Sequence, residues 1–230
     1  MHFDPKSVLS ARTLDVRYPT DVSNIELDSV IFSDLDVWRL ACALDGGCVD
    51  VSVSTICTEV NGTVEEVGSI ELRSANTLYC AQPTVRSIFQ EISGESVISI
   101  VGNENIFLRP EWQRKGIGRL AVAMQAKVAH RLGFSRIRAD VGGIGRPGYV
   151  VWPAIGFDGL IPGDVWSRFD ERTLKSLGLS PDIPVNVSAF YRSAEGRAAW
   201  EKFGAGFPME LVLASGEAPF EALVKVADGF

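Results

Sequence analysis

Residues 113–118, QRKGIG, combine basic side chains and glycines in a spacing that could bind an anion. An apolar trio, residues 106–108, precedes them, and apolar residues at helical spacing follow. Backbone N–H groups at the start of a helix lack intrahelical partners and lie at the positive end of the helix dipole, and glycine lets an anion approach them closely. The stretch therefore predicts a phosphate-binding turn at the mouth of a helix, with room for a pyrophosphate.

The elements around this turn follow from the same pattern. Residues 105–109 are predicted to form a short strand that stops at Pro110, because proline cannot donate to a sheet ladder. Residues 119–132 are predicted to form an amphipathic helix. Alternation over residues 136–141 predicts the next strand. The order is strand, turn, helix and strand.

One interpretation of the glycines is a dinucleotide site. Gly116, Gly118 and Ala121 satisfy the GxGxxA pattern, and Asp140 lies near the distance of about 20 residues expected of a ribose-binding acid. In that fold the first glycine closes the strand directly, whereas six residues, 110–115, intervene here. An NAD-dependent oxidoreductase is therefore the less favoured alternative.

A second interpretation rests on a family resemblance. Gln113-x-x-Gly116-x-Gly118, preceded by Leu108-Arg109-Pro110 and followed by an amphipathic helix, resembles the acetyl-CoA motif of the GNAT (Gcn5-related) N-acetyltransferase superfamily. Residues 152–157, WPAIGF, are similar to the family's YxxxGF segment. The resemblance covers residues 95–157 well, with a weaker echo over 196–214.

The resemblance implies a fold and a cosubstrate. It implies an α+β fold with a mixed, mostly antiparallel central sheet, helices on both faces and a splayed parallel strand pair at the CoA site. Acetyl-CoA would be the cosubstrate, with no metal. The pantetheine arm would run along Phe107, Leu108 and Arg109, and Gln113 would order the turn. The phosphates would meet the N–H groups of Arg114, Lys115, Gly116, Ile117, Gly118 and Arg119.

The chemistry implied is acyl-CoA-dependent N-acyl transfer to a primary amine, by direct attack in a ternary complex. The acceptor could be a protein lysine, an N-terminus or a small amine. The reaction needs a deprotonated amine, a stabilised oxyanion and a proton for the leaving thiolate.

The family's usual tyrosine position is occupied by Trp152 in this sequence. Tyr149 is the nearest candidate acid, with Tyr191 more remote, and Glu104 is a candidate base. Asp140 could reach the cleft or pair with neighbouring arginines. A catalytically silent CoA-binding module is the alternative that Trp152 suggests.

The remaining chain predicts an α+β arrangement. A helix is expected over 34–44, strands over 48–60 and 64–72 around the Asn61-Gly62 turn, a short helix over 84–92 and a strand over 96–101. We expect a single acetyltransferase domain over residues 1–230, with an N-terminal extension, 1–33, and an insertion, 158–195. The insertion is expected to carry a helix over 164–177 and to be either a lid or acceptor-recognition element, or structural padding.

Composition narrows the functional classes. A net charge of −7 and a pI near 5.0 disfavour a nucleic-acid groove and favour a cationic or neutral acceptor. The four cysteines form no CxxC pair, and the two histidines stand apart from them, which argues against zinc. No stretch reaches the 18 or so apolar residues of a membrane span, and the first residues lack an apolar leader, so a cytoplasmic protein without membrane association is expected.

Overall fold

The structure is a computed structural model that describes residues 5–10, 12–27, 29–60, 63–93, 96–104, 106–139 and 148–229. The chain divides into two compact units. Unit 1 comprises Met1–Ile137 and Val212–Phe230, and unit 2 comprises Arg138–Leu211.

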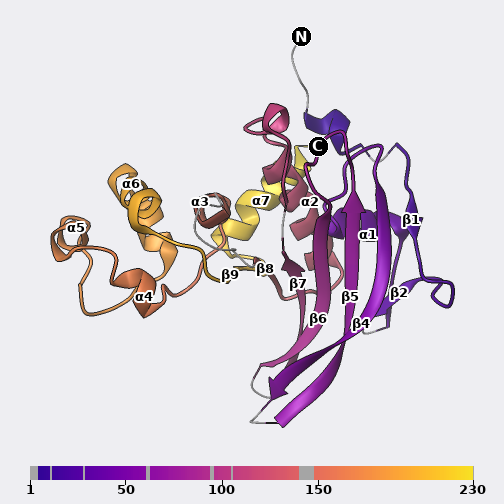
Figure 1. Ribbon diagram of the computed structural model, residues 1–230, viewed down its shortest axis with the longest axis horizontal. Coiled ribbons are helices and arrows are strands. Elements are labelled where there is room, and N and C mark those ends of the chain that lie inside the picture. Colours follow the sequence, from indigo (N-terminus) through magenta and orange to yellow (C-terminus); the bar gives the residue numbers. More distant parts are fainter. Residues whose placement is uncertain are drawn as a thin grey trace. The chain divides into compact units, whose positions relative to one another are not determined.

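Seven strands form one mixed sheet in the order β1-β4-β5-β6-β7-β8-β9 (Figure 1). The strands β4 to β7 pair antiparallel in succession, whereas β1 pairs parallel with β4 and β8 parallel with β7. The predicted α+β class with a mixed, mostly antiparallel sheet is therefore confirmed. The bounds are β1 Val16–Arg17, β4 Cys48–Val60, β5 Thr63–Ala75, β6 Thr84–Ser93, β7 Ser96–Asn103, β8 Arg136–Ala139 and β9 Met209–Val212. A separate hairpin pairs β2 Ile25–Leu27 with β3 Val30–Phe32.

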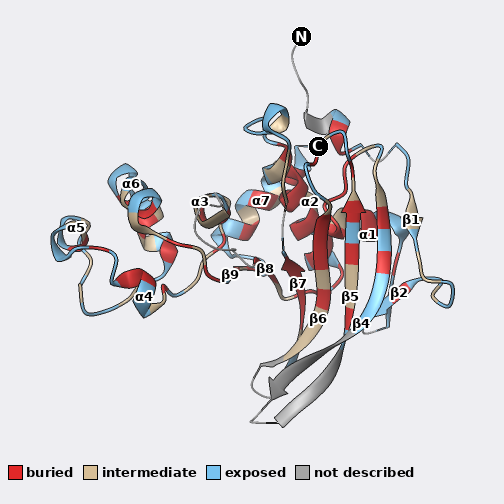
Figure 2. Cartoon of the chain, in the orientation of Figure 1, coloured by how far each residue is buried: buried red, intermediate tan, exposed pale blue. Residues whose placement is uncertain are grey.

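Helices cover one face of the sheet in unit 1. At the start of β4, Val49 and Val51 are buried while Asp50 and Ser52 are exposed, an alternation that gives this part of the strand one core face and one solvent face (Figure 2). The helices α1 (Asp34–Leu40) and α2 (Ile117–Arg131) lie against each other behind these strands, and α7 (Ala218–Asp228) packs on α2.

A buried polar link fixes α2 to its neighbours. Gln125, on α2, is fully buried, and its Nε2 donates to the carbonyl of Leu40 at 2.7 Å. The amides of Gln125 and Asn103 also bond to each other, at 2.8 and 2.9 Å. Because buried amides are costly when unpaired, this link holds α2 in register with the end of α1 and the end of β7.

Residues 84–92 form a strand, so the predicted helix there is wrong. The apolar positions Val85, Ile88 and Phe89 fit a helical spacing. The same stretch is rich in β-branched residues, however, and it lies in the sheet between β5 and β7 as β6. Pairing on both sides determined the outcome.

Other boundaries also differ from the sequence prediction. The helix predicted over 34–44 ends at Leu40, and the strand predicted over 64–72 runs from Thr63 to Ala75. The strand predicted over 96–101 continues to Asn103. The separate strand predicted over 105–109 is wrong as stated, because among its described residues, 106–109, only Leu108 makes a β-bridge, to Cys80. Helix α7 was not predicted.

The N-terminal residues that the sequence left unplaced form a short 3₁₀ helix, η1 (Pro5–Val8), and the strands β1 to β3. Val8 and Leu9 are 1% and 2% exposed, and they pack in a cluster with Ile117 and Leu120 of α2. The predicted extension therefore contributes core residues beneath the start of α2.

Unit 2 is held together by aromatic side chains. Trp200 is fully buried, with its ring stacked on Phe169 at 6.0 Å and tilted against Phe190 at 5.5 Å. Trp152 and Trp166, each 6% exposed, are also buried. The helices are α3 Gly148–Ala154, α4 Gly163–Trp166, α5 Glu171–Ser176, the 3₁₀ helix η3 Val187–Arg192 and α6 Ala194–Phe203. The predicted insertion, 158–195, lies wholly within this unit.

The single helix predicted over 164–177 is wrong. Helix α4 ends at Trp166 and α5 begins at Glu171. Asp170 separates them because its side chain caps α5, accepting from the N–H of Thr173 at 2.7 Å.

Candidate cofactor-binding site

Residues 107–109 present an open main-chain edge in unit 1. On one side, the N–H of Ala81 donates to the carbonyl of Phe107 at 2.7 Å and the N–H of Arg109 donates to the carbonyl of Tyr79 at 2.9 Å. Main-chain groups alternate in direction along an extended segment, so those of Leu108 point to the other side. The Leu108 N–H makes no hydrogen bond within the described part of the chain. This donor is available to an extended ligand.

Gln113 closes the turn that follows. Its Nε2 donates to the carbonyl of Leu108 at 2.9 Å, across the 3₁₀ helix η2 (Pro110–Trp112). The side-chain bond stands in for a backbone partner and fixes the distance between the extended segment and the glycines.

Trp112 anchors this turn to the rest of unit 1. Its Nε1 donates to the carbonyl of Leu78 at 3.1 Å, and its ring lies edge-on to Tyr79 at 4.9 Å. Asn76, 7% exposed, holds that neighbouring loop by accepting from the N–H groups of Leu78 and Tyr79. Sequence reasoning missed this support, because nothing local to Trp112 indicates contact with residues 76–79.

The mouth of α2 carries donors without intrahelical partners. The first helical bond runs from the N–H of Leu120 to the carbonyl of Gly116 at 3.0 Å. The N–H groups of Ile117, Gly118 and Arg119 precede it, and no side chain caps the helix. Arg114 and Gly116 have φ of 58° and 80°, so the turn alternates through the left-handed region that forms anion-binding nests. We call residues 113–119 the cradle.

The cradle also has room for a ligand. A Cβ at Gly116 would have no neighbour within 4 Å, and one at Gly118 would meet only Leu108 Cδ1 at 3.9 Å. Positive φ explains the glycine at 116. Neither packing nor φ requires glycine at 118. The residues present therefore fit a pyrophosphate held against main-chain N–H groups.

The charge around the cradle opposes the charge of the whole chain. Arg109, Arg114, Lys115 and Arg119 are all exposed here, and Glu111 is the only acid between them in sequence. The Lys115 Nζ lies 4.5 Å from the centre of the Trp112 ring, a cation–π contact that also steadies the turn. The local field is positive although the net charge is −7.

The structure brings all ten predicted cofactor-binding residues, 107–109 and 113–119, into this one region of unit 1. Glu104 is exposed and directly follows β7 in the same unit. Tyr149 belongs to α3 of unit 2. Asp140 lies outside the described residues, so its predicted pairing with Arg136 or Arg138 is not tested.

Both candidate phenols are already hydrogen bonded. The Tyr149 hydroxyl donates to the carbonyl of Glu201 at 2.9 Å, and the Tyr191 hydroxyl donates to the carbonyl of Val150 at 2.8 Å. Burial, assisted by the charge of Glu201, raises the pKa of Tyr191 to about 12. Tyr191 is thereby a weaker proton donor at neutral pH than an exposed phenol.

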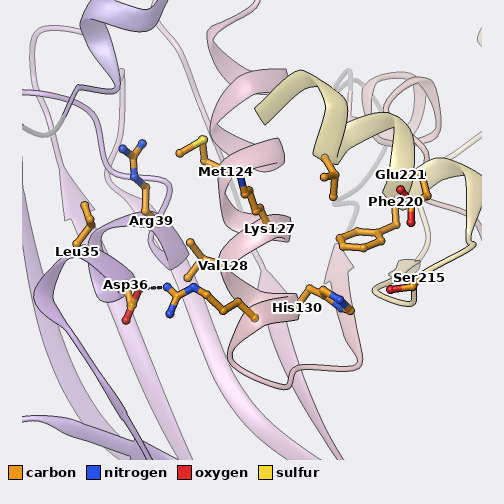
Figure 3. A pocket seen from close by; sticks show the side chains of 12 residues that line it. Leu35, Asp36, Arg39, Met124, Lys127, Val128, His130, Ser215, Phe220 and Glu221 are labelled. Carbon is orange, nitrogen blue, oxygen red and sulfur yellow. Dashed lines mark hydrogen bonds and ion pairs between the residues drawn. The ribbon is translucent and has the colours of Figure 1, made fainter. Parts of the chain in front are cut away.

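A cavity of about 490 Å³ lies elsewhere in unit 1, between α1, α2 and α7 (Figure 3). Two ion pairs involve its lining residues: Asp36 with Arg131, and Lys127 with Asp228 at 2.5 Å. No cradle residue lines it. His130 lies here, with its Nδ1 3.0 Å from the carbonyl of Leu213. The size of this cavity alone does not make it the reactive site.

The described residues contain neither a metal-binding cluster nor a membrane-spanning helix. No group of three or more His, Cys, Asp or Glu side chains there could hold a metal ion. No helix in that part of the chain is both long enough and apolar enough to cross a membrane.

No family model matches the chain, and no curated protein matches it. Among solved structures, the crystal structure of nourseothricin acetyltransferase is similar over 71% of this chain and 88% of that one, with 14% sequence identity and a TM-score of 0.31. A likeness of this size carries no argument about fold, substrate or mechanism.

Proposed function

We propose that the chain is a GNAT-like N-acetyltransferase that transfers an acetyl group from acetyl-CoA to a primary amine. The observation that carries the proposal is the mouth of α2, where the N–H groups of residues 117–119 precede the first helical bond beside open space at Gly118. It follows the open edge at Leu108 in the order that a CoA pantetheine and pyrophosphate require. One acetyltransferase domain over residues 1–230 remains part of this proposal.

The chain's residues would divide the work as follows. Acetyl-CoA would supply a thioester as the acyl donor. The Leu108 edge would align its pantetheine arm, while the cradle N–H groups and Arg114 would neutralise its phosphates. Glu104 or Asp140 would take the proton that the attacking amine must lose. The Tyr149 hydroxyl would give a proton to the departing thiolate.

The catalytic roles are separable from cofactor binding by substitution. We expect Glu104→Gln, Asp140→Asn and Tyr149→Phe to leave the Kd for acetyl-CoA within about threefold while lowering kcat by on the order of 10²-fold wherever the role holds. The rate at which each variant releases free thiol from acetyl-CoA, measured with a panel of primary amines, gives its kcat. A variant that turns over at the wild-type rate is not the acid or base.

A catalytically silent CoA-binding module is the second candidate. Trp152 is buried where the family places its tyrosine, and both nearby phenols donate to main-chain carbonyls. This candidate predicts acetyl-CoA binding without thiol release for any amine. Neither test depends on the expected cytoplasmic setting or on the expected absence of nucleic-acid and membrane partners.

The nucleotide-cofactor oxidoreductase is the least favoured. Strand β7 ends at Asn103, well before Gly116, whereas the dinucleotide fold closes its strand directly on the first glycine. Parallel calorimetric titrations with acetyl-CoA, CoA and NADH distinguish it. Binding of NADH in place of CoA would overturn the acetyltransferase proposal.

A further inference from the structure

A second cavity, of about 340 Å³, lies wholly within unit 2. Its walls come from three separate places: Tyr149 on α3, Arg168 after α4, and the end of α6 with the loop at residues 204–206. We call it the unit 2 cavity. Of its lining residues, only Tyr149 has a role in the proposed reaction.

The charges that line the unit 2 cavity are all positive. Arg168 and Lys202 both line it, both are exposed, and no acidic residue does so. Neither cation makes an ion pair within the described part of the chain. Lys202 Nζ instead lies 4.6 Å from the centre of the Phe203 ring. The cavity therefore carries two charges that protein groups leave unneutralised.

The loop after α6 adds main-chain donors. Gly204 donates to the carbonyl of Trp200 at 2.8 Å. The N–H groups of Ala205 and Gly206 make no hydrogen bond to any residue that the structure describes. A Cβ at Gly204 would lie 2.6 Å from the Trp200 carbonyl oxygen and 2.7 Å from its ring, so close packing on Trp200 requires glycine and sets the path of the loop.

The walls are fixed before any ligand arrives. The Tyr149 hydroxyl donates to the carbonyl of Glu201, and Trp200 Nε1 donates to the carbonyl of Tyr149 at 2.8 Å. Each helix thus donates one hydrogen bond to the other, and the two bonds hold α3 against α6. A cavity whose shape is already set spends less binding free energy on ordering its side chains.

One effect opposes an anion here. The C-terminal end of α6 presents carbonyl groups, equivalent to roughly half a negative charge. Two full positive charges outweigh it, and the rings of Tyr149 and Phe203 supply apolar walls beside them. The local chemistry favours a small molecule with an oxyanion at one end and an apolar body.

We propose that the unit 2 cavity binds the carboxylate or phosphate group of a small molecule that also has an apolar body. The net charge of −7 did not indicate such a site, because the charge at this cavity differs in sign from that of the whole chain.

Titration of the full-length protein with two probes and their neutral counterparts tests the site. The probes are 3-phenylpropionate and phenyl phosphate, and the neutral counterparts are 3-phenylpropionamide and phenol. We expect the amide resonances of Ala205 and Gly206 to move in ¹⁵N NMR with at least one anion and with neither neutral compound. Which anion binds more tightly decides between a carboxylate and a phosphate. Equal shifts from the neutral compounds, or none from the anions, would overturn the proposal.

Matched variants locate the binding. Arg168→Met and Lys202→Met keep most of the side-chain stem and remove the charge, and each should weaken anion binding by about tenfold. Arg172→Met removes an exposed arginine of α5 that does not line the cavity and should change nothing. Anion affinity that is unaffected by both lining variants would contradict the assignment.

The oxyanion site and the proposed function fail separately. If acetyl-CoA does not bind while Ala205 and Gly206 respond to anions, the proposed function falls and the oxyanion site stands. If amines are acetylated but neither anion moves the Ala205 and Gly206 resonances, the oxyanion site is wrong and the proposed function stands.

Discussion

The cradle and the unit 2 cavity are both suited to anions, but they are built from different materials. The cradle consists of consecutive residues, 113–119, and relies on main-chain N–H groups at the start of α2. The unit 2 cavity draws Tyr149, Arg168 and Lys202 from three separate elements and relies on side-chain charge. A main-chain site depends on local backbone conformation, whereas a side-chain site depends on tertiary packing.

The two sites should therefore respond differently to substitution. Substitution of Gly118, of Gln113 in the turn or of Trp112, which anchors the turn, should affect the cradle. Changes in the aromatic core should affect the unit 2 cavity, since Trp200 supports both its loop and Tyr149.

The largest effect is expected from Trp200→Ala. Trp200 is fully buried among Phe169, Phe190 and Phe207, so its removal should cost about 3–5 kcal/mol of unfolding free energy. Chemical denaturation followed by circular dichroism measures the loss. Val151→Ala, at a 48% exposed position of the same unit, is the control. A cost below about 1 kcal/mol for Trp200→Ala would show that the aromatic cluster does not hold unit 2.

Trp112→Ala tests the anchor of the cradle. It removes the bond to the Leu78 carbonyl and the edge-on contact with Tyr79, each contributing about 1 kcal/mol. We expect about tenfold weaker acetyl-CoA binding by calorimetry, because the turn must then be ordered on binding. Trp112→Phe keeps the ring contact, so its affinity for acetyl-CoA should lie between those of the wild type and Trp112→Ala. Unchanged affinity in Trp112→Ala would mean that the turn needs no anchor.

Gln113→Ala should have a smaller effect on the same site. Only one hydrogen bond, to the Leu108 carbonyl, is lost, and it is solvent-exposed, which sets the cost at about 0.5–1.5 kcal/mol. The affinity for acetyl-CoA should fall by roughly threefold to tenfold. Gln90→Ala changes a glutamine on β6, away from the cradle, and serves as the comparison. An effect as large in Gln90→Ala would remove any special role for Gln113.

The smallest effect is a dependence of stability on pH at Asp36. Burial by itself raises the pKa of this carboxyl, but bonds from Ser33 and the ion pair with Arg131 together lower the pKa below its usual value. The contribution to stability is therefore present above the unfolded pKa, near 4, and is lost as pH falls through the lower folded value.

Equilibrium unfolding between pH 7 and pH 2 checks this sign. Asp36→Asn should flatten the acid limb of the stability curve. Asp182→Asn, an exposed carboxylate of unit 2, should leave that limb as it is. A wild-type stability that rises on acidification through this range would contradict the account of Asp36.

The features that could be predicted from the sequence are the local ones, and those that depend on tertiary packing could not. The turn at residues 113–118, the helix after it and the α+β class were readable, because glycine spacing and apolar periodicity act over a few residues. The role of residues 84–92 was not, since Val85 and Ile88 stand at helical spacing and only pairing with β5 and β7 makes the segment a strand. Trp112 and the unit 2 cavity were missed because their contacts join segments far apart in the chain.

The most direct test of the central claim is calorimetric titration of Gly118→Glu with acetyl-CoA. The space at Gly118 admits a side chain without a clash in the protein, so the variant should fold, while its carboxylate would occupy the phosphate position and repel the ligand. Gly163→Glu is the matched control, a glycine at the start of α4 with nothing within 4 Å. We predict wild-type binding that survives in Gly163→Glu and weakens at least 100-fold in Gly118→Glu. Equal binding by all three proteins would contradict the cradle as the cofactor site.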